Sequence, residues 1–292
     1  NNTYITFIYL PPFSLPPSLQ AMKLVAFAVP LAYNGDVQPT GYNCCVVGDI
    51  TCLPPSQAGF RSALVNRGAR DTYFFWKGRL FQRKSCMDAT CAQLYDPAII
   101  SVAAASLTVR VKRSTTAATR FSSSDVAIHE SLGYGTYVFQ ATGTFAKMDL
   151  KTAFSMYTLD TCSSDAGNQF GRKLEMTVSK WNNAADPGAQ SGAQPQTTPA
   201  NMFKYAMPVN PLSTTTASTF VLEWTPVAVR FYTIKGLKPL AQLNAVASSD
   251  IISAFTVTNA AAIPTPGRAA VHVGMFLVPG ATATASGNAV SA

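Results

Sequence analysis

The sequence predicts an all-β fold, an antiparallel double-sheet jelly-roll sandwich. Short segments rich in β-branched and aromatic residues recur along the chain, and each is bounded by Gly, Pro, Asn or Ser. No segment keeps helical periodicity for three turns, and no internal repeat suggests a solenoid or a propeller. Two packed antiparallel sheets are the economical architecture for such a pattern.

The strand pattern is clearest in the second half of the chain. The predicted strands span residues 107–111, 135–145, 151–159, 173–181, 219–226, 229–236 and 270–278. Residues 182–199 differ, because they include no large aliphatic or aromatic side chain and are rich in Gly, Pro, Asn and Gln. This stretch is predicted to be a long loop, which in a compact domain is usually functional or disordered.

The domain organisation follows from the two ends of the chain. Residues 1–21 are expected to form an extended N-terminal strand and a Pro-rich arm, because Pro cannot donate to a sheet ladder. Such an arm packs on its own domain or adds to the sheet edge of a neighbour. Residues 22–280 are expected to form a single jelly-roll domain, followed by a small-residue tail at 281–292. Residues 22–32 look like a short signal peptide, but their apolar run is too short, so we expect structured chain.

The composition limits the classes of partner. The chain has 292 residues, of which only 12% are charged, and its formal net charge is +8. The basic residues are spread thinly rather than in a stripe that could track phosphates, so we expect no nucleic-acid partner. No apolar stretch approaches the roughly 18 to 20 residues of a membrane span, so we expect no membrane span.

The cysteines indicate the compartment. The chain has six, in a sequence rich in Ser, Thr, Ala, Gly and Pro, which favours an extracellular, secreted or cell-surface protein with up to three disulfides. The sequence leaves their pairing open. Cysteine spacing and two isolated histidines, His129 and His272, do not fit a zinc site, so we expect no metal and no cofactor. Both histidines are expected to be structural.

Several motifs occur in a fixed order along the chain. They are YDP at 95–97, SLTVRV at 106–111, GYGTY at 133–137, TAFSMYTLD at 152–160, LEMTVSKW at 174–181 and EWTP at 223–226 within a longer hairpin to residue 236. Over about residues 70 to 280 this order and spacing resemble family 16 glycoside hydrolases and their concanavalin A-like lectin relatives. The resemblance implies a concanavalin A-like jelly roll.

The resemblance also identifies a candidate catalytic strand. Family members carry alternating carboxylates on one strand, which period-two geometry places on one face of the sheet. Glu175 matches the nucleophile, Thr177 stands where the family has Asp, and Ser179 stands where it has the acid/base; a bulged variant of the motif would put Lys180 there. Only the first carboxylate is retained, and a retaining mechanism needs two carboxyls about 5 to 5.5 Å apart.

We therefore expect a non-catalytic domain that binds carbohydrate or serves as a structural, self-assembling surface protein. A serine hydroxyl cannot replace a carboxylic acid as proton donor, and losing general acid/base help costs about two to four orders of magnitude in rate. The alternative is an active retaining β-glucan hydrolase or transglycosylase that uses Glu175 with a rearranged acid/base. Asp160, Asp165 and Asp186 flank the strand and are the candidates for that role.

The resemblance suggests ligand-binding residues as well. Trp181 and Asn182 follow the catalytic strand, at a point where the family uses aromatic rings to stack on sugars. Tyr157 lies on the neighbouring strand, and Arg172 precedes Glu175. The expected ligand is a polysaccharide such as β-glucan. A structural role predicts instead a homo-oligomer or filament that forms through the N-terminal arm at residues 3–10.

Overall fold

The structure is a computed structural model, and it describes part of the chain. The described residues are 3–6, 72–76, 79–83, 96–102, 106–113, 121–131, 134–143, 145, 148–160, 172–194, 201–207, 216–264 and 270–278. The six cysteines, the Pro-rich arm, residues 22–32 and the C-terminal tail lie outside these ranges, so the expectations about them remain predictions.

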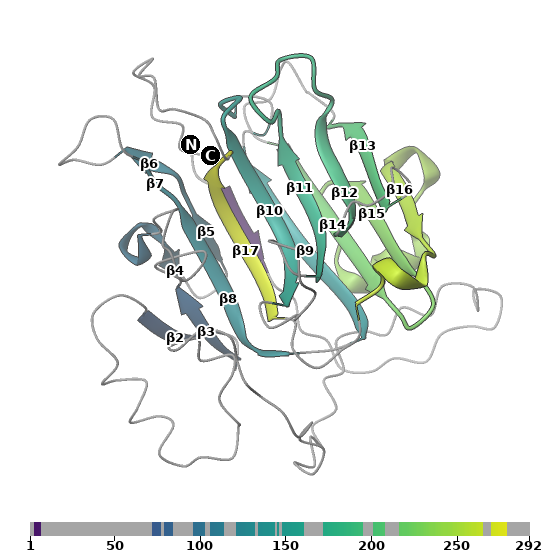
Figure 1. The fold of residues 1–292 in the computed structure, drawn as a ribbon, viewed down its shortest axis with the longest axis horizontal. Helices are drawn as coiled ribbons and strands as arrows, with labels where there is room; N and C mark the ends of the chain where they lie inside the picture. Colours follow the sequence, from purple (N-terminus) through teal and green to yellow (C-terminus); the bar gives the residue numbers. More distant parts are fainter. Residues whose placement is uncertain are drawn as a thin grey trace, which may run out of the picture.

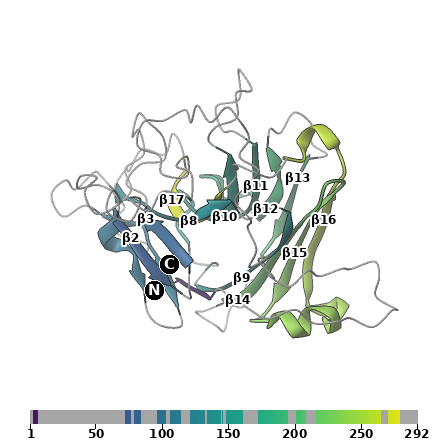
Figure 2. The same cartoon turned by 90° about the horizontal axis from the view of Figure 1, so that it is seen from below.

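Two antiparallel sheets pack face to face (Figures 1 and 2). The seven-stranded sheet has the order β16 (Ile251–Val257), β15 (Val229–Lys235), β14 (Thr216–Trp224), β9 (Gly135–Gly143), β1 (Thr3–Thr6), β5 (Leu107–Val109) and β4 (Ser101–Val102). The eight-stranded sheet has the order β13 (Met202–Ala206), β12 (Gly188–Gln194), β11 (Arg172–Ser179), β10 (Thr152–Asp160), β17 (Ala270–Leu277), β8 (Ser124–Ser131), β3 (Arg79–Arg83) and β2 (Thr72–Trp76). The predicted all-β jelly-roll sandwich is confirmed.

Short elements complete the described chain. They are the ribbon of β6 (Lys112–Arg113) with β7 (Phe121–Ser122), and the 3₁₀ helices η3 (Pro97–Ile99), η6 (Leu240–Ala245), η7 (Ser248–Asp250) and η8 (Ala260–Ala262). In the part of the chain that the structure describes, no helix is long and apolar enough to cross a membrane.

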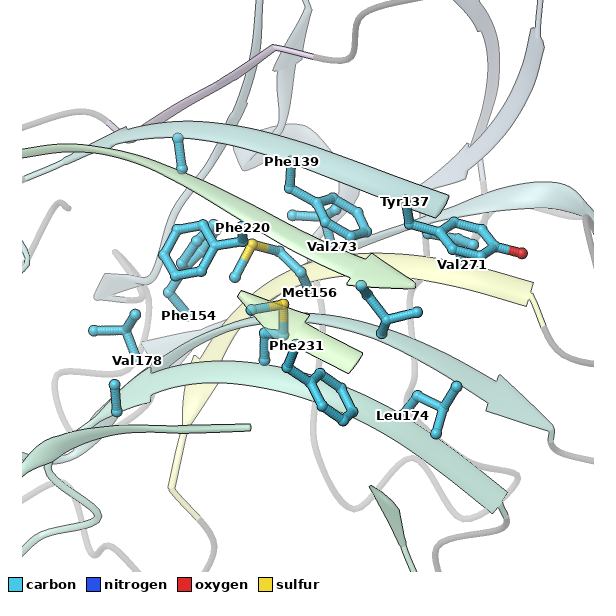
Figure 3. Close-up of a cluster of buried hydrophobic side chains, with 14 of the residues drawn as sticks. Tyr137, Phe139, Phe154, Met156, Leu174, Val178, Phe220, Phe231, Val271 and Val273 are labelled. Atoms are coloured by element: carbon cyan, nitrogen blue, oxygen red, sulfur yellow. The ribbon is translucent and has the colours of Figure 1, made fainter. Parts of the chain in front are cut away.

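The hydrophobic core lies between the two sheets. Alternate residues of β10 and β11 supply Phe154, Met156 and Leu174, and they face Phe220 and Phe231 from the other sheet (Figure 3). Period-two alternation places every second side chain of these strands on the core face. The strands predicted at 151–159, 173–181, 219–226 and 229–236 correspond to β10, β11, β14 and β15.

The prediction of a long loop at residues 182–199 is wrong in part. Gly188–Gln194 forms β12, which pairs with β11 on one side and β13 on the other. Five of its seven residues are Gly, Ala or Ser, and all but the last residue are buried. A Cβ at Gly192 would lie 2.2 Å from the carbonyl oxygen of Asn201, so the close approach of β13 requires glycine there. Tertiary packing overrides the low strand propensity of this segment.

The N-terminal strand lies inside its own sheet. β1 pairs with β9 on one edge and β5 on the other, with Tyr4 opposite Thr142 and Thr108. The sequence allowed the N-terminal strand either to pack on its own domain or to add to the sheet edge of a neighbour. In the structure, Thr3–Thr6 packs on its own domain.

Candidate functional site

The strand predicted to be catalytic is β11, in the interior of the eight-stranded sheet. Leu174 and Met176 point into the core, so Glu175, Thr177 and Ser179 share the opposite face. Register extends this face across five neighbouring strands, and we call it the polar face. Its residues are Asp125, Ser155, Tyr157, Lys173, Glu175, Thr177, Ser179, Gln190, Gln194 and His272.

Glu175 is buried, and both of its carboxylate oxygens have partners. Lys173 Nζ lies 2.6 Å from Oε2, and the exposed fractions of the two side chains are 12% and 3%. Gln190 Nε2 donates to Oε1 at 2.9 Å, and Gln194 Nε2 donates to the same atom at 3.4 Å. A nucleophile must direct an oxygen lone pair at the anomeric carbon, whereas these oxygens are directed at fixed donors inside the fold.

The two positions that the motif lacks carry hydroxyls used inside the fold. Thr177 Oγ1 and Ser155 Oγ share a buried hydrogen bond of 2.7 Å. Ser179 Oγ donates to the carbonyl oxygen of Thr152 at 2.9 Å and accepts from the Trp181 N–H at 2.9 Å. Ser179 therefore fastens the end of β11, and neither position offers a carboxylic acid.

Among the described side chains, Asp125 is the other carboxylate of the polar face. It lies on β8, three strands away from β11 through β17 and β10. At about 4.8 Å per strand, the two backbones are about 14 Å apart. Tyr157 stands between the two carboxylates, since its hydroxyl donates to Asp125 and its ring contacts Lys173, the partner of Glu175, so the two do not face one bond as a catalytic pair does.

Asp186 lies between β11 and β12 and serves the turn. Lys204 Nζ lies 2.6 Å from its Oδ2, and the Gly188 N–H donates to its Oδ1 at 3.0 Å. Gly192 pairs with Glu175, and Gly188 lies four residues, about 13 Å, further along β12; Asp186 precedes Gly188 in the turn. Glu223 is the only other glutamate whose side chain the structure describes, and it lies on the other sheet. The Asp160 side chain and all of Asp165 fall outside the described atoms.

Asp125, His272 and Tyr157 form a second buried cluster. His272 Nδ1 lies 2.8 Å from Asp125 Oδ2, and the Tyr157 hydroxyl donates to Oδ1 at 3.1 Å. The Tyr157 and His272 rings stack at 4.8 Å, and Lys173 Nζ lies 4.4 Å from the Tyr157 ring centroid. A Cβ at residue 274, which is glycine, would lie 2.7 Å from Asp125 Oδ1. The clusters around Glu175 and Asp125 are thus linked through Lys173.

Trp181 and Asn182 are displayed at the end of β11. Both have positive φ, 48° and 58°, a left-handed conformation that is uncommon outside glycine and is often found at functional sites. The Trp181 ring is half-buried against Ala153 and Phe276, and among the described residues its buried Nε1 has no hydrogen-bond partner. Asn182 is exposed, and its N–H donates to the Leu150 carbonyl at 2.6 Å.

The other predicted ligand-binding residues occupy different settings. Tyr157 is only 2% exposed, and its hydroxyl is used by Asp125. Arg172 begins β11 opposite Asp160, and its side chain is outside the described atoms. The structure therefore brings Glu175, Thr177, Ser179 and Tyr157 together on the floor of the polar face, with Trp181 and Asn182 at its end. Within the described ranges, no group of three or more His, Cys, Asp or Glu side chains could hold a metal ion.

No protein-family model matches the chain, and no curated protein matches it in sequence. Solved structures similar to the chain include a β-1,3-1,4-glucanase (lichenase) from a mouse hindgut metagenome, at 9% identity, 75% of this chain, 93% of that chain and a TM-score of 0.49. The κ-carrageenase of Pseudoalteromonas carrageenovora is 13% identical, over 77% of this chain and 92% of that chain, with a TM-score of 0.46. A pseudo β-1,3-glucanase of Mycobacterium tuberculosis is 14% identical, over 68% of this chain and 80% of that chain, with a TM-score of 0.43. At these identities the likeness concerns the fold, and the chemistry must be argued from this chain's own side chains.

Proposed function

We propose that the chain is an extracellular, non-catalytic domain of the family 16 glycoside hydrolase type that binds a polysaccharide such as β-glucan. The observation that carries the proposal is the state of Glu175, whose two oxygens are engaged by Lys173, Gln190 and Gln194. The hydroxyl at the acid/base position, Ser179, is used to fasten a strand end.

The chemistry of glycoside hydrolysis supports this proposal. A retaining mechanism needs a nucleophile and a proton donor on opposite sides of one bond. No other carboxylate among the described side chains lies on β11 or on the two strands that pair with it: Asp125 is three strands away, about 14 Å by backbone, and Asp186 lies in the turn before Gly188. A lysine-paired carboxylate also loses nucleophilicity, because its negative charge is already compensated.

The binding half of the proposal rests on Trp181 and Asn182. A flat indole ring stacks on a pyranose face, and the Trp181 ring is half-buried at the end of β11, so part of it is accessible to a ligand. Asn182 adds an exposed amide beside it. The floor of the polar face is buried, so we assign recognition to these end residues and support to the floor.

The extracellular assignment and an additional structural role are supported by composition alone. Six cysteines and a low charge fraction favour an oxidising compartment. Assembly through the N-terminal arm must involve residues 7–10 or strand exchange, because both edges of Thr3–Thr6 are occupied by β9 and β5.

The catalytic alternative is tested on laminarin, mixed-linkage glucan and xyloglucan. We expect no reducing-end release and no transglycosylation from the chain or from Glu175→Gln. Robust turnover that Glu175→Gln abolishes would establish the hydrolase alternative and overturn the non-catalytic proposal.

Binding is tested by affinity electrophoresis and calorimetry with the same glucans. We expect Trp181→Ala to weaken binding at least about tenfold, the loss of roughly one stacking contact. Tyr134→Ala is the matched control, since this exposed aromatic lies in the bend just before β9 of the other sheet, with its ring against Trp224. Equal affinity of the parent and Trp181→Ala, or no affinity in any of the three, would overturn the proposed binding site.

A further inference from the structure

The Trp181 indole lies over the end of the polar face. It packs against Ala153 of β10 and Phe276 of β17, two residues that pair across these strands. Ala153 is four residues from Tyr157, and Phe276 is four residues from His272, so period two places both on the polar face. The ring is therefore turned back from the end of β11 over the strands that follow it in the sheet, β10 and β17.

The backbone that turns the ring back is in a conformation that costs free energy. Trp181 and Asn182 both have positive φ, which a residue other than glycine adopts only when its surroundings hold it there. Trp181 N–H donates to Ser179 Oγ at 2.9 Å, and Asn182 N–H donates to the Leu150 carbonyl at 2.6 Å. Of these two hydrogen bonds, the first uses a side chain, that of Ser179.

Ser179 also bonds the strand on which the ring lies. Its Oγ donates to the carbonyl oxygen of Thr152 at 2.9 Å, while it accepts from Trp181. Thr152 begins β10 and directly precedes Ala153, against which the indole packs. One buried hydroxyl thus joins the backbone of Trp181 to the strand that seats its ring, and an alanine at position 179 would remove both hydrogen bonds.

We propose that Ser179 is a positioning residue that holds the Trp181 indole in the orientation that binds a ligand. The inference rests on the proposed function, in which Trp181 stacks on a sugar. Ser179 is buried, so it acts through Trp181 and not by touching the polysaccharide. The position where family 16 glycoside hydrolases carry the acid/base therefore serves recognition in this chain, through the backbone of the residue two places further on.

Thr219 provides a matched control on the other sheet. Its Oγ1 donates to the Gly236 carbonyl at 2.8 Å and accepts from the Lys238 N–H at 2.8 Å, so it also joins two backbone groups through one buried hydroxyl. Thr219→Val removes that hydroxyl and keeps the shape of the side chain. It should destabilise the chain much as Ser179→Ala does, but on β14 of the seven-stranded sheet, away from Trp181.

The first test needs no ligand. Amide hydrogen exchange followed by NMR should show slow exchange of the Trp181 N–H in the parent. Ser179→Ala should accelerate this exchange at least about tenfold, whereas Thr219→Val should not, because only the former removes the acceptor. A Trp181 amide that exchanges in the parent as fast as in an unstructured peptide would contradict the assignment, even if Ser179→Ala failed to fold.

The second test is a double-mutant cycle on the affinity for laminarin and mixed-linkage glucan, measured by calorimetry. Ser179→Ala should weaken binding about three- to tenfold, and Thr219→Val should leave it unchanged. The double variant Ser179→Ala/Trp181→Ala should bind no more weakly than Trp181→Ala, because Ser179 acts only through the ring. A role in general stability would instead make the two losses add.

The outcomes separate this inference from the proposed function. A parent without glucan affinity, whose Trp181 amide nevertheless depends on Ser179, would contradict polysaccharide binding and retain the positioning of the ring. A parent that binds would overturn the positioning role if Ser179→Ala kept full affinity or if the losses in the double variant were additive. Equal exchange of the Trp181 amide in Ser179→Ala and Thr219→Val would overturn it as well.

Discussion

The outer faces of the two sheets are covered by different chemistry. On the seven-stranded sheet, Val221 and Ile234 are packed under Leu240 and Leu243 of η6. On the eight-stranded sheet, the polar face is just as buried but carries carboxylates, a lysine, a histidine and amides. Removing one apolar contact from the first face costs only the free energy of that contact. Removing one partner from a buried polar group costs more, because the other partner stays buried without a hydrogen bond or a counter-charge. The polar face is therefore the region where a single substitution should cost most.

The largest effect should come from Lys173→Met. It leaves the Glu175 carboxylate buried without its cation, which we expect to lower the free energy of unfolding by about 3 to 5 kcal/mol. Urea denaturation measures the loss. The double variant Lys173→Met/Glu175→Gln removes both charges and should recover most of it. A single variant as stable as the parent would show that the pair is not buried in solution.

Leu243→Ala tests the apolar cover and should cost less, about 2 to 3 kcal/mol, because it removes a mostly buried side chain at the outside of a sheet. Leu243→Met keeps the volume and should cost under about 1.5 kcal/mol. If Leu243→Ala were more damaging than Lys173→Met, the two faces would rank in the opposite order to the one argued above.

Gly274→Ala tests the second cluster of the polar face. Its Cβ would come within 2.7 Å of Asp125 Oδ1, and we expect about 1 to 3 kcal/mol of destabilisation by overpacking. Gly135→Ala is the matched control, because a Cβ there meets nothing within 4 Å. Thermal unfolding of both variants measures the difference, and equal midpoints would mean that the carboxylate can move aside.

The smallest effect concerns a polar group between the sheets. Burial raises the pKa of Tyr205 above its ordinary value of 10.0, although hydrogen bonds to Ser191 and Thr233 lower it in part. Above pH 10 the unfolded chain loses this proton before the folded chain does, so stability should fall as the pH rises further. Tyr205→Phe should flatten this alkaline decline in urea titrations, and an unchanged decline would assign it to other groups.

Strands with strong local signals could be predicted from the sequence, and those defined by their neighbours could not. β10, β14 and β15 are rich in β-branched and aromatic residues, and β11 alternates the apolar Leu174, Met176 and Val178 with polar residues. β12, with the sequence GAQSGAQ, has no such signal, and it is a strand because β11 and β13 pair with its two edges.

The candidate site likewise has residues that local sequence predicts and a pairing that only the fold reveals. The position of Glu175 follows from the motif, and period two places Lys173 on the same face of β11 although Lys173 is not part of the motif. The pairing of Asp125 with His272 joins residues 147 positions apart, which local pattern cannot reveal.

The place of β1 in its sheet has a consequence for the order of folding. β9 and β5 make no ladder with each other, and they are joined through Thr3–Thr6. Contacts between residues so distant in sequence are entropically expensive and form late. The seven-stranded sheet should therefore first assemble as β16 to β9 and be completed last by insertion of β1, a closing step that delays full protection of the β9 amides.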